Sequence, residues 1–262
     1  MAKLVVFIDA EITVADKKIR DLGAVTADGA CFHSGSLRDF IAFISKADFL
    51  CGHNIVRHDL KYIQAAVGKE LNFPAVDTLF LSPLLFPKRP YHKLLKDDKI
   101  QVDELNNPVN DSEKAADLFY DEINAFCALP LQTRNIFCKL LNEQPEFSGF
   151  FKYLDFQPDD GDVSELIRGE YSGKLCANAD IRQLVKNTPV ELAYALALIG
   201  ADDRYSITPP WLQKNYPKID NVVKYLRNTP CSEPCAYCKS AHDVHKKLKE
   251  IFGFDEFRTY NG

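Results

Sequence analysis

The chain has 262 residues, 46% of them hydrophobic and 26% charged, which is ordinary for a globular protein with one large domain or two smaller ones. Its net charge of −5 excludes a uniformly basic surface but allows a local nucleic-acid groove. The longest apolar run, near Leu192–Ala201, is too short to span a bilayer, and the N-terminus lacks a signal-peptide pattern. We therefore expect a cytoplasmic protein with no membrane partner.

The first half of the chain alternates between expected strands and helices. Apolar, β-branched runs bounded by turn residues predict strands over 3–12, 18–29, 30–36 and 47–54, and a further strand that leads into a proline-broken segment over 76–87. Helical spacing of apolar residues predicts helices over 37–47, 55–68 and 111–129. This order predicts an α/β domain over residues 1–129, with a mixed sheet flanked by helices.

The second half has a different character. Residues 130–228 are expected to form a smaller, mainly helical region, because helical spacing covers 131–154 and 189–201. An acidic linker rich in proline, glycine and aspartate is expected over 156–165. Residues 229–262 form a third segment, which begins with a group of cysteines.

Two carboxylates lie at the end of the first expected strand. Asp9 and Glu11 are two residues apart, and side chains alternate faces along a strand, so both point to the same side and repel each other. Asp59 and Asp111 lie near the beginnings of two helices, where each by itself could simply stabilise a helix N-terminus. Mg²⁺ and Mn²⁺ take oxygen ligands of this kind, and bound metal would offset the repulsion.

Three sequence blocks occur in a definite order: D-x-E at 9–11, HN-x3-HD-L at 53–60 and NP-x2-D-S at 107–112. This order resembles that of the DEDD 3′–5′ exonucleases, which have the DnaQ-like, ribonuclease H-like fold. The resemblance covers roughly residues 1–127. It implies a catalytic site in which two Mg²⁺ or Mn²⁺ ions, about 3.5–4 Å apart, assist hydrolysis of terminal phosphodiesters. The implied ligands are Asp9, Glu11, Asp59 and Asp111.

One position departs from that family's pattern. Where one branch has a histidine five residues before the last aspartate, this chain has Asn106, and where another branch has a tyrosine it has Asn107. Neither amide can act as a general base, so we expect slower rather than abolished chemistry. His92, in a basic aromatic segment, is a hypothetical catalytic substitute. His58 is expected to point away from Asp59 along the helix.

Substrate contacts are expected from two places. The segment 87–99 is basic and aromatic, which fits either a phosphate-contacting surface or a solvated helix face. The His-Asn pair at 53–54 could position substrate, or it could cap and tie its loop. The candidate substrate-binding residues are therefore His53, Asn54, Asn106, Lys88, Arg89 and Lys93.

The eight cysteines fall into two groups. The first group is scattered through apolar surroundings and is expected to consist of reduced core thiols: Cys31, Cys51, Cys127, Cys138 and Cys176. The second group has the spacing C-x3-C-x2-C-x3-H, which predicts a closed, tetrahedral, structural Zn²⁺ site, with an Fe–S cluster as the alternative. Its ligands would be Cys231, Cys235, Cys238 and His242, with His245 as the second choice for the fourth.

The segment FGFDEFR at 252–258 resembles the opening of the helicase core in RecQ-like DNA helicases. No G-x4-GK[ST] phosphate loop occurs in the sequence, so no ATPase is expected within it. The resemblance implies that a helicase core follows in a longer chain and that the substrate is DNA, single-stranded or at 3′ ends. Two alternatives stay open: a nuclease-like DNA-binding module with weak or no chemistry, tethered to a helicase, and an RNA-trimming enzyme similar to oligoribonucleases.

Overall fold

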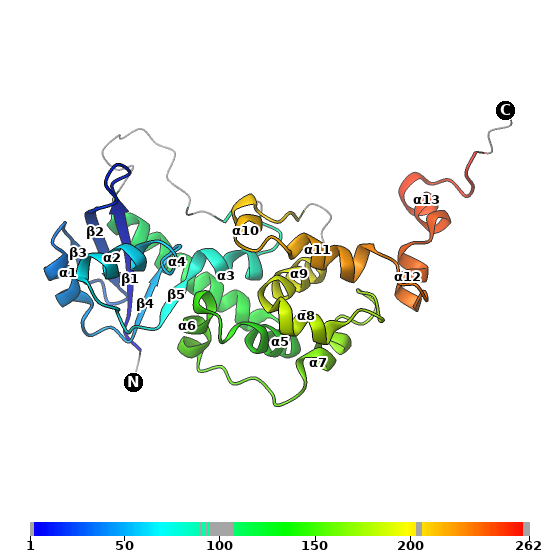
Figure 1. Ribbon diagram of the computed structural model, residues 1–262, viewed down its shortest axis with the longest axis horizontal. Coiled ribbons are helices and arrows are strands. Elements are labelled where there is room, and N and C mark those ends of the chain that lie inside the picture. The colour runs from blue at the N-terminus through cyan, green and yellow to red at the C-terminus, as the bar shows by residue number, and fades with distance from the viewer. Residues whose placement is uncertain (1–2, 90, 93, 95–106, 203–205, 259–262) are drawn as a thin grey trace. The chain divides into compact units, whose positions relative to one another are not determined.

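The computed structural model describes residues 3–89, 91–92, 94, 107–202 and 206–258, which divide into two compact units, up to Asp159 and from Asp160 (Figure 1). The division falls inside the predicted acidic linker and not at the predicted domain boundary after residue 129. Helices α5 (Leu131–Leu141) and α6 (Pro145–Leu154) belong to the first unit. A Cβ on Gly149 of α6 would collide with the carbonyl group of Ala75, so only glycine allows α6 to lie this close to the sheet.

The described residues of the first unit form a five-stranded sheet in the order β3-β2-β1-β4-β5. Strand β1 pairs antiparallel with β2 and parallel with β4, β2 pairs antiparallel with β3, and β4 pairs parallel with β5. The predicted mixed sheet is therefore confirmed. The strands are β1 (Val5–Ile12), β2 (Ile19–Thr26), β3 (Cys31–His33), β4 (Phe49–Gly52) and β5 (Ala75–Asp77).

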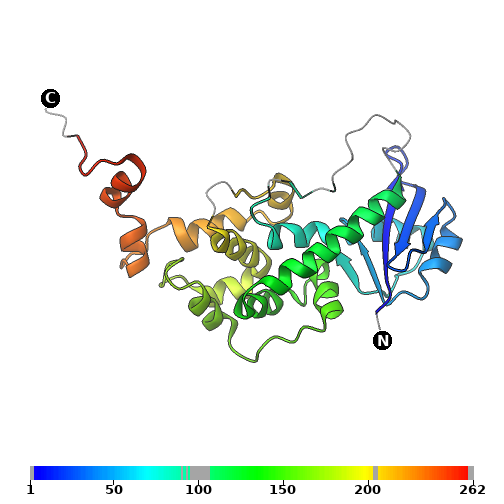
Figure 2. The same cartoon turned by 180° about the vertical axis from the view of Figure 1, so that it is seen from behind.

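Helices cover both faces of this sheet. In Figures 1 and 2, α1 and α2 lie on one face and the long helix α4 crosses the other, with α3 packed beside α4. The helices are α1 (Leu37–Ile44), α2 (Asp59–Val67), α3 (Thr78–Leu85) and α4 (Pro108–Ala128).

Side chains alternate along β1, so successive residues of this strand point to opposite faces of the sheet. Val6 and Ile8 are buried in the core under α1 and α2. Phe7 points to the opposite face, where its ring lies 5.6 Å from that of Phe119 on α4. Asp9 and Glu11 have the same parity as Phe7, so the strand directs both carboxylates toward the α4 side.

The far half of α4 is held by aromatic packing within the first unit. The ring of Phe126 lies 5.5 Å from Phe150, 5.7 Å from Phe151 and 5.4 Å from Phe156, in edge-to-face arrangements. Phe126 and Phe150 are fully buried. These contacts fix α4 at the end opposite to the acidic residues of β1.

The segment 76–87, predicted as a strand that leads into a proline-broken segment, contains the end of a short strand followed by a helix. Only Ala75–Asp77 pairs in the sheet, and Asp77 then begins α3 by accepting the N–H of Leu79. Pro83 lies inside α3 and removes one helical hydrogen bond, which costs about 3 kcal/mol. Burial of Phe80 and its apolar neighbours, worth about 1.5–3 kcal/mol for each side chain, outweighs that cost.

The helix predicted over 55–68 begins only at Asp59. Residues before it form a turn, in which Asn54 has a positive φ of 67°. The fully buried carboxylate of Asp77 holds this turn by accepting the N–H groups of Asn54 at 2.9 Å and Val56 at 3.1 Å. Burial raises the pKa of Asp77 to about 7, against the lowering effect of these N–H donors.

The described residues of the second unit form helices, and helices also occupy most of the described part of the region 130–228 for which they were predicted. Helix α9 is apolar on all sides and is buried among its neighbours, with Leu192, Ala193 and Leu196 inaccessible to solvent. Among the described residues, no helix is both long and apolar enough to cross a membrane. The helices are α7 (Val163–Glu170), α8 (Ile181–Asn187), α9 (Pro189–Ala201), α10 (Pro210–Asn215), α11 (Ile219–Val223), the π-helical turn η1 (Lys224–Asn228), α12 (Ala236–Ala241) and α13 (Val244–Phe252).

Candidate metal centres

Three of the predicted carboxylates come together in the first unit. Carboxylate oxygens of Asp9, Glu11 and Asp111 lie within 4.8 Å of one another, and all three residues are partly buried. We call these three residues the acidic group. Two come from β1 and one from the first turn of α4, on the sheet face that α4 covers.

Local sequence determines where α4 begins. Asn107 caps the helix, its side-chain oxygen accepting the N–H of Val109 at 3.0 Å, and Pro108 occupies the first helical position. This places Asp111 in the first turn, where the helix N-terminus favours a negative charge. The sequence N-P-x-x-D thus sets both the start of the helix and the position of the carboxylate.

Gly23 of β2 lets the start of α4 reach the acidic group. It pairs with Asp9 in the antiparallel register of β1 and β2. A Cβ at this position would collide with the backbone of Pro108 and Val109. The absence of a side chain on Gly23 therefore allows Asp111 to lie beside Asp9, a role that the sequence analysis did not identify.

Asp59 lies next to the acidic group but outside it. Its side chain is almost fully buried, and one oxygen accepts the N–H of Ala10 at 2.8 Å. That N–H lies between Asp9 and Glu11 in β1, beyond the part of the strand that pairs with β4. Burial raises the pKa of Asp59, while the contact with His58 and the N–H of Ala10 lower it.

His58 does not point away from Asp59, so that prediction is wrong. Because α2 begins at Asp59, His58 precedes the helix with φ −118° and ψ −80°, and its Nδ1 lies 3.7 Å from an Asp59 oxygen. The contact with Asp59 raises the pKa of His58, helped by the negative charge of Glu11. A helix that starts four residues later than predicted thus turns this imidazole toward the acidic residues.

His92 is buried and His53 is partly buried, and neither belongs to the acidic group. Nδ1 of His92 lies 2.9 Å from the hydroxyl of Ser82, and Nδ1 of His53 lies 2.9 Å from that of Thr78. Burial lowers the pKa of each to about 4. Both rings are therefore neutral near pH 7, and their hydroxyl partners belong to α3.

The other candidate substrate contacts have mixed outcomes. Asn54 is bound through its backbone to Asp77, which fits the structural reading of the His-Asn pair. Lys88 is exposed, and the guanidinium of Arg89 lies over the ring of Phe86, 3.7 Å from its centroid. Lys93 and Asn106 lie outside the described residues.

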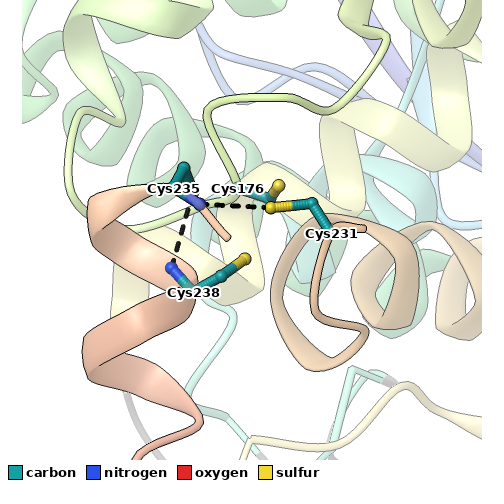
Figure 3. A group of neighbouring side chains, drawn as sticks. All are labelled: Cys176, Cys231, Cys235 and Cys238. Atoms are coloured by element: carbon teal, nitrogen blue, oxygen red, sulfur yellow. Dashed lines mark hydrogen bonds between the residues drawn. The ribbon is translucent and has the colours of Figure 1, made fainter. Parts of the chain in front are cut away.

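The second unit contains a cluster of four cysteines, shown in Figure 3. The sulfur atoms of this thiol cluster lie within 4.8 Å of one another, and they belong to Cys176, Cys231, Cys235 and Cys238. Two of its members, Cys176 and Cys238, are buried. None of the four is in a disulfide.

The cluster contains three of the four predicted zinc ligands, Cys231, Cys235 and Cys238. Cys176, expected as an isolated core thiol, joins the cluster, whereas His242, expected as the fourth ligand, is not part of it. The Nε2 atom of His242 is shielded from solvent and has no hydrogen-bond partner among the described residues. Cys176 is far from the other three in sequence, so spacing rules could not find it.

Hydrogen bonds hold the two segments of the cluster together. The N–H of Cys176 donates to the carbonyl oxygen of Leu226 at 2.8 Å. The side-chain amide of Asn178 donates to the sulfur of Cys231 at 3.5 Å and to the carbonyl oxygen of Glu233 at 2.9 Å. The loop after α7 is thereby fixed against the segment that precedes α12.

Backbone N–H groups also point at the sulfur atoms. The N–H of Cys235 lies 3.3 Å from the sulfur of Cys231, and that of Cys238 lies 3.5 Å from the sulfur of Cys235 (Figure 3). Such donors favour thiolates: the N–H groups of Cys238 and Ala177 lower the pKa of Cys235 to about 6. Burial acts in the opposite direction and raises the pKa of Cys176 to about 12.

Comparisons with protein-family models, curated proteins and solved structures find no match for this chain. Both centres consequently have to be interpreted from their own geometry. The acidic group offers hard oxygen ligands and the thiol cluster offers soft sulfur ligands, so the two sites suit different metals.

Proposed function

We propose that the first unit is a metal-dependent 3′–5′ exonuclease of the DEDD type with a ribonuclease H-like fold. The observation that carries this proposal is the convergence of Asp9, Glu11 and Asp111 from β1 and α4. Strand pairing and the cap of α4 hold these carboxylates together against their mutual repulsion, an arrangement that a divalent cation would stabilise. The order of the sequence blocks supports the same reading.

The donor set fits Mg²⁺ or Mn²⁺, because it consists of carboxylate oxygens alone. Asp9, Glu11 and Asp111 would hold the ions, with Asp59 beside them. When bound, such ions lower the pKa of water and neutralise charge on the leaving oxygen. The chain's own contribution is to fix these carboxylates on a strand and a helix start rather than on loops.

Proton transfer would have to use groups other than Asn106. His58 is the imidazole that the structure brings into contact with Asp59, whereas His92 is buried against Ser82. His58 is also partly exposed, so solvent can exchange protons with it. We therefore prefer His58 to His92 as a participant in the reaction.

DNA is the proposed substrate, and a helicase core in a longer chain is the proposed partner. This part of the proposal rests on FGFDEFR at 252–258 and its similarity to RecQ-like helicases. The second candidate function is a DNA-binding module that holds a DNA end without efficient cleavage. The amide at position 106, where a related branch has histidine, favours that candidate.

The test uses the full chain with single-stranded DNA labelled at the 5′ end in one sample and at the 3′ end in another. Mg²⁺, Mn²⁺ and EDTA are compared, with RNA of the same sequence as a competitor. An exonuclease gives a ladder of shortened 5′-labelled products and releases the 3′ label as a mononucleotide. EDTA should stop both.

A matched pair of variants assigns the reaction to the acidic group. Asp111→Asn should abolish cleavage, whereas Asp117→Asn, on the exposed side of the same helix, should leave it unchanged. Cleavage that survives in Asp111→Asn would contradict the proposed site. DNA binding without cleavage in either metal would establish the binding module, and preferential cleavage of RNA would replace the DNA assignment.

A further inference from the structure

We propose that Cys176, Cys231, Cys235 and Cys238 bind one Zn²⁺ ion, which fastens the segment at 231–238 to the loop after α7. This site lies entirely in the second unit and uses none of the residues of the acidic group. The proposal of a zinc site is therefore independent of the proposed nuclease activity.

The spacing of the sulfur atoms fits a single ion. Four thiolates arranged tetrahedrally at a Zn–S distance of about 2.3 Å lie about 3.8 Å apart. The sulfur atoms here are all within 4.8 Å of one another, so binding requires a contraction of at most about 1 Å. An Fe–S cluster distributes its four thiolates over two or four iron atoms and needs a wider opening, so this geometry disfavours that alternative.

The surroundings are suited to hold thiolates at a metal. A Zn²⁺ ion with four thiolates carries a net negative charge, which N–H donors to sulfur partly compensate. The backbone N–H groups of Cys235 and Cys238 and the amide of Asn178 supply such donors. Soft sulfur ligands in a closed tetrahedral set select Zn²⁺ over Mg²⁺ or Ca²⁺.

The position of the ligands gives the ion a structural role. All four coordination positions are taken by protein, so none remains for a substrate or a reacting water. Cys176 lies in the loop after α7, Cys231 and Cys235 precede α12, and Cys238 lies in α12 itself. In sequence, α8, α9, α10, α11 and η1 lie between the first ligand and the other three. Binding therefore closes a long loop of the chain and restricts the start of α12.

Metal content is the first measurement. The full chain, purified without added metal, should contain about one zinc ion per molecule by elemental analysis. Counts of reactive thiols before and after release of the ion should show protection of the cluster. Iron in place of zinc, or disulfides between cluster cysteines with no metal, would overturn the assignment.

Substitution with Co²⁺ distinguishes the fourth ligand. Four thiolates give charge-transfer absorption and strong visible bands, which shift to shorter wavelength when an imidazole nitrogen replaces one sulfur. We expect the four-sulfur spectrum for the wild type and for His242→Ala. A three-sulfur spectrum in the wild type that changes in His242→Ala would restore His242 and exclude Cys176.

Cysteine variants complete the test. Cys176→Ser should lower zinc affinity by more than the roughly 10–100-fold that loss of an outer-shell partner costs. Cys127→Ser removes an exposed thiol outside the cluster and should leave affinity and spectrum unchanged. If Cys176→Ser fails to fold, the spectra of the wild type and His242→Ala still decide between the two ligand sets.

Discussion

The acidic group and the thiol cluster are both candidate metal centres, but the chain builds them in different ways. Asp9, Glu11 and Asp111 lie on regular elements whose positions follow from strand pairing and from a helix cap. Three cysteines of the thiol cluster lie close together in sequence, and the fourth arrives from a distant loop. The first centre depends on the core of its unit, whereas the second can strengthen a unit whose own last segment is weakly packed.

The contrast extends to what surrounds each centre. Beside the acidic group, β1 and α4 are packed through buried rings such as Phe7 and Phe119. Beyond the thiol cluster, α13 contains no buried residue. We infer that strand pairing, the cap of α4 and packing of its rings hold the acidic residues in place without a metal, and that the segment around Cys231–Cys238 needs its metal.

The largest effect is expected for Gly23→Ala, which should disturb the acidic group and leave the thiol cluster intact. The new Cβ would displace the start of α4 and with it Asp111, and a misplacement of about 1 Å can cost roughly 100-fold in rate. Cleavage of single-stranded DNA should fall by at least about 100-fold while bound zinc stays constant. Gly169→Ala, where a Cβ meets nothing, is the control. Wild-type activity in Gly23→Ala would mean that Asp111 does not take part.

Removal of zinc should affect the second unit, around the thiol cluster, and leave the first unit unchanged. A ligand held at 100 times its dissociation constant adds about 2.7 kcal/mol to the stability of the form that binds it, which is about 100-fold in the opening equilibrium. A zinc-selective chelator, used with Mg²⁺ retained, should therefore increase tryptic cleavage after Lys239 by about 100-fold. The first unit should keep its protease resistance. An equal increase in tryptic cleavage of both units would show that the zinc site stabilises more of the chain than the segments that carry its ligands.

The smallest expected effect concerns pH. Burial lowers the pKa of His53 and His92 from 6.5 to about 4, so the unfolded chain binds more protons than the folded one between these values. These two histidines therefore contribute stability to the first unit that is complete above pH 6.5 and is lost as pH falls toward 4, with a slope of about two protons. Asp77, whose pKa burial raises to about 7, contributes in the opposite direction over this range. The free energy of unfolding of the first unit can be followed at each pH from the protection of the β1 amides against hydrogen exchange, relative to their intrinsic exchange rates at that pH. His92→Asn should remove about one proton from the slope. An unchanged slope would contradict the assigned burial.

Much of the first unit could be predicted because its signals are local. Alternation along β1 placed Asp9 and Glu11 on one face, and N-P-x-x-D placed Asp111 near a helix start. The start of α2 could not be predicted, because Asp77, distant in sequence, holds residues 54–56 in a turn. The error in the direction of His58 follows directly from that one tertiary contact.

The thiol cluster shows the opposite limit. Sequence spacing identified Cys231, Cys235 and Cys238, because these three ligands lie within one short segment of the chain. The fourth ligand depends on how the loop after α7 folds back onto η1, through the hydrogen bond from Cys176 to Leu226. A nearby histidine with suitable spacing was therefore chosen in place of a distant cysteine.

Helix α4 joins two distant parts of the first unit in one stiff rod. Asp111 lies in its first turn, and Phe126, about 22 Å further along the axis, is clamped between the rings of α6 and the residues after it. A substitution among the rings that contact Phe126 would therefore act on the helix that carries Asp111 without contacting the acidic group.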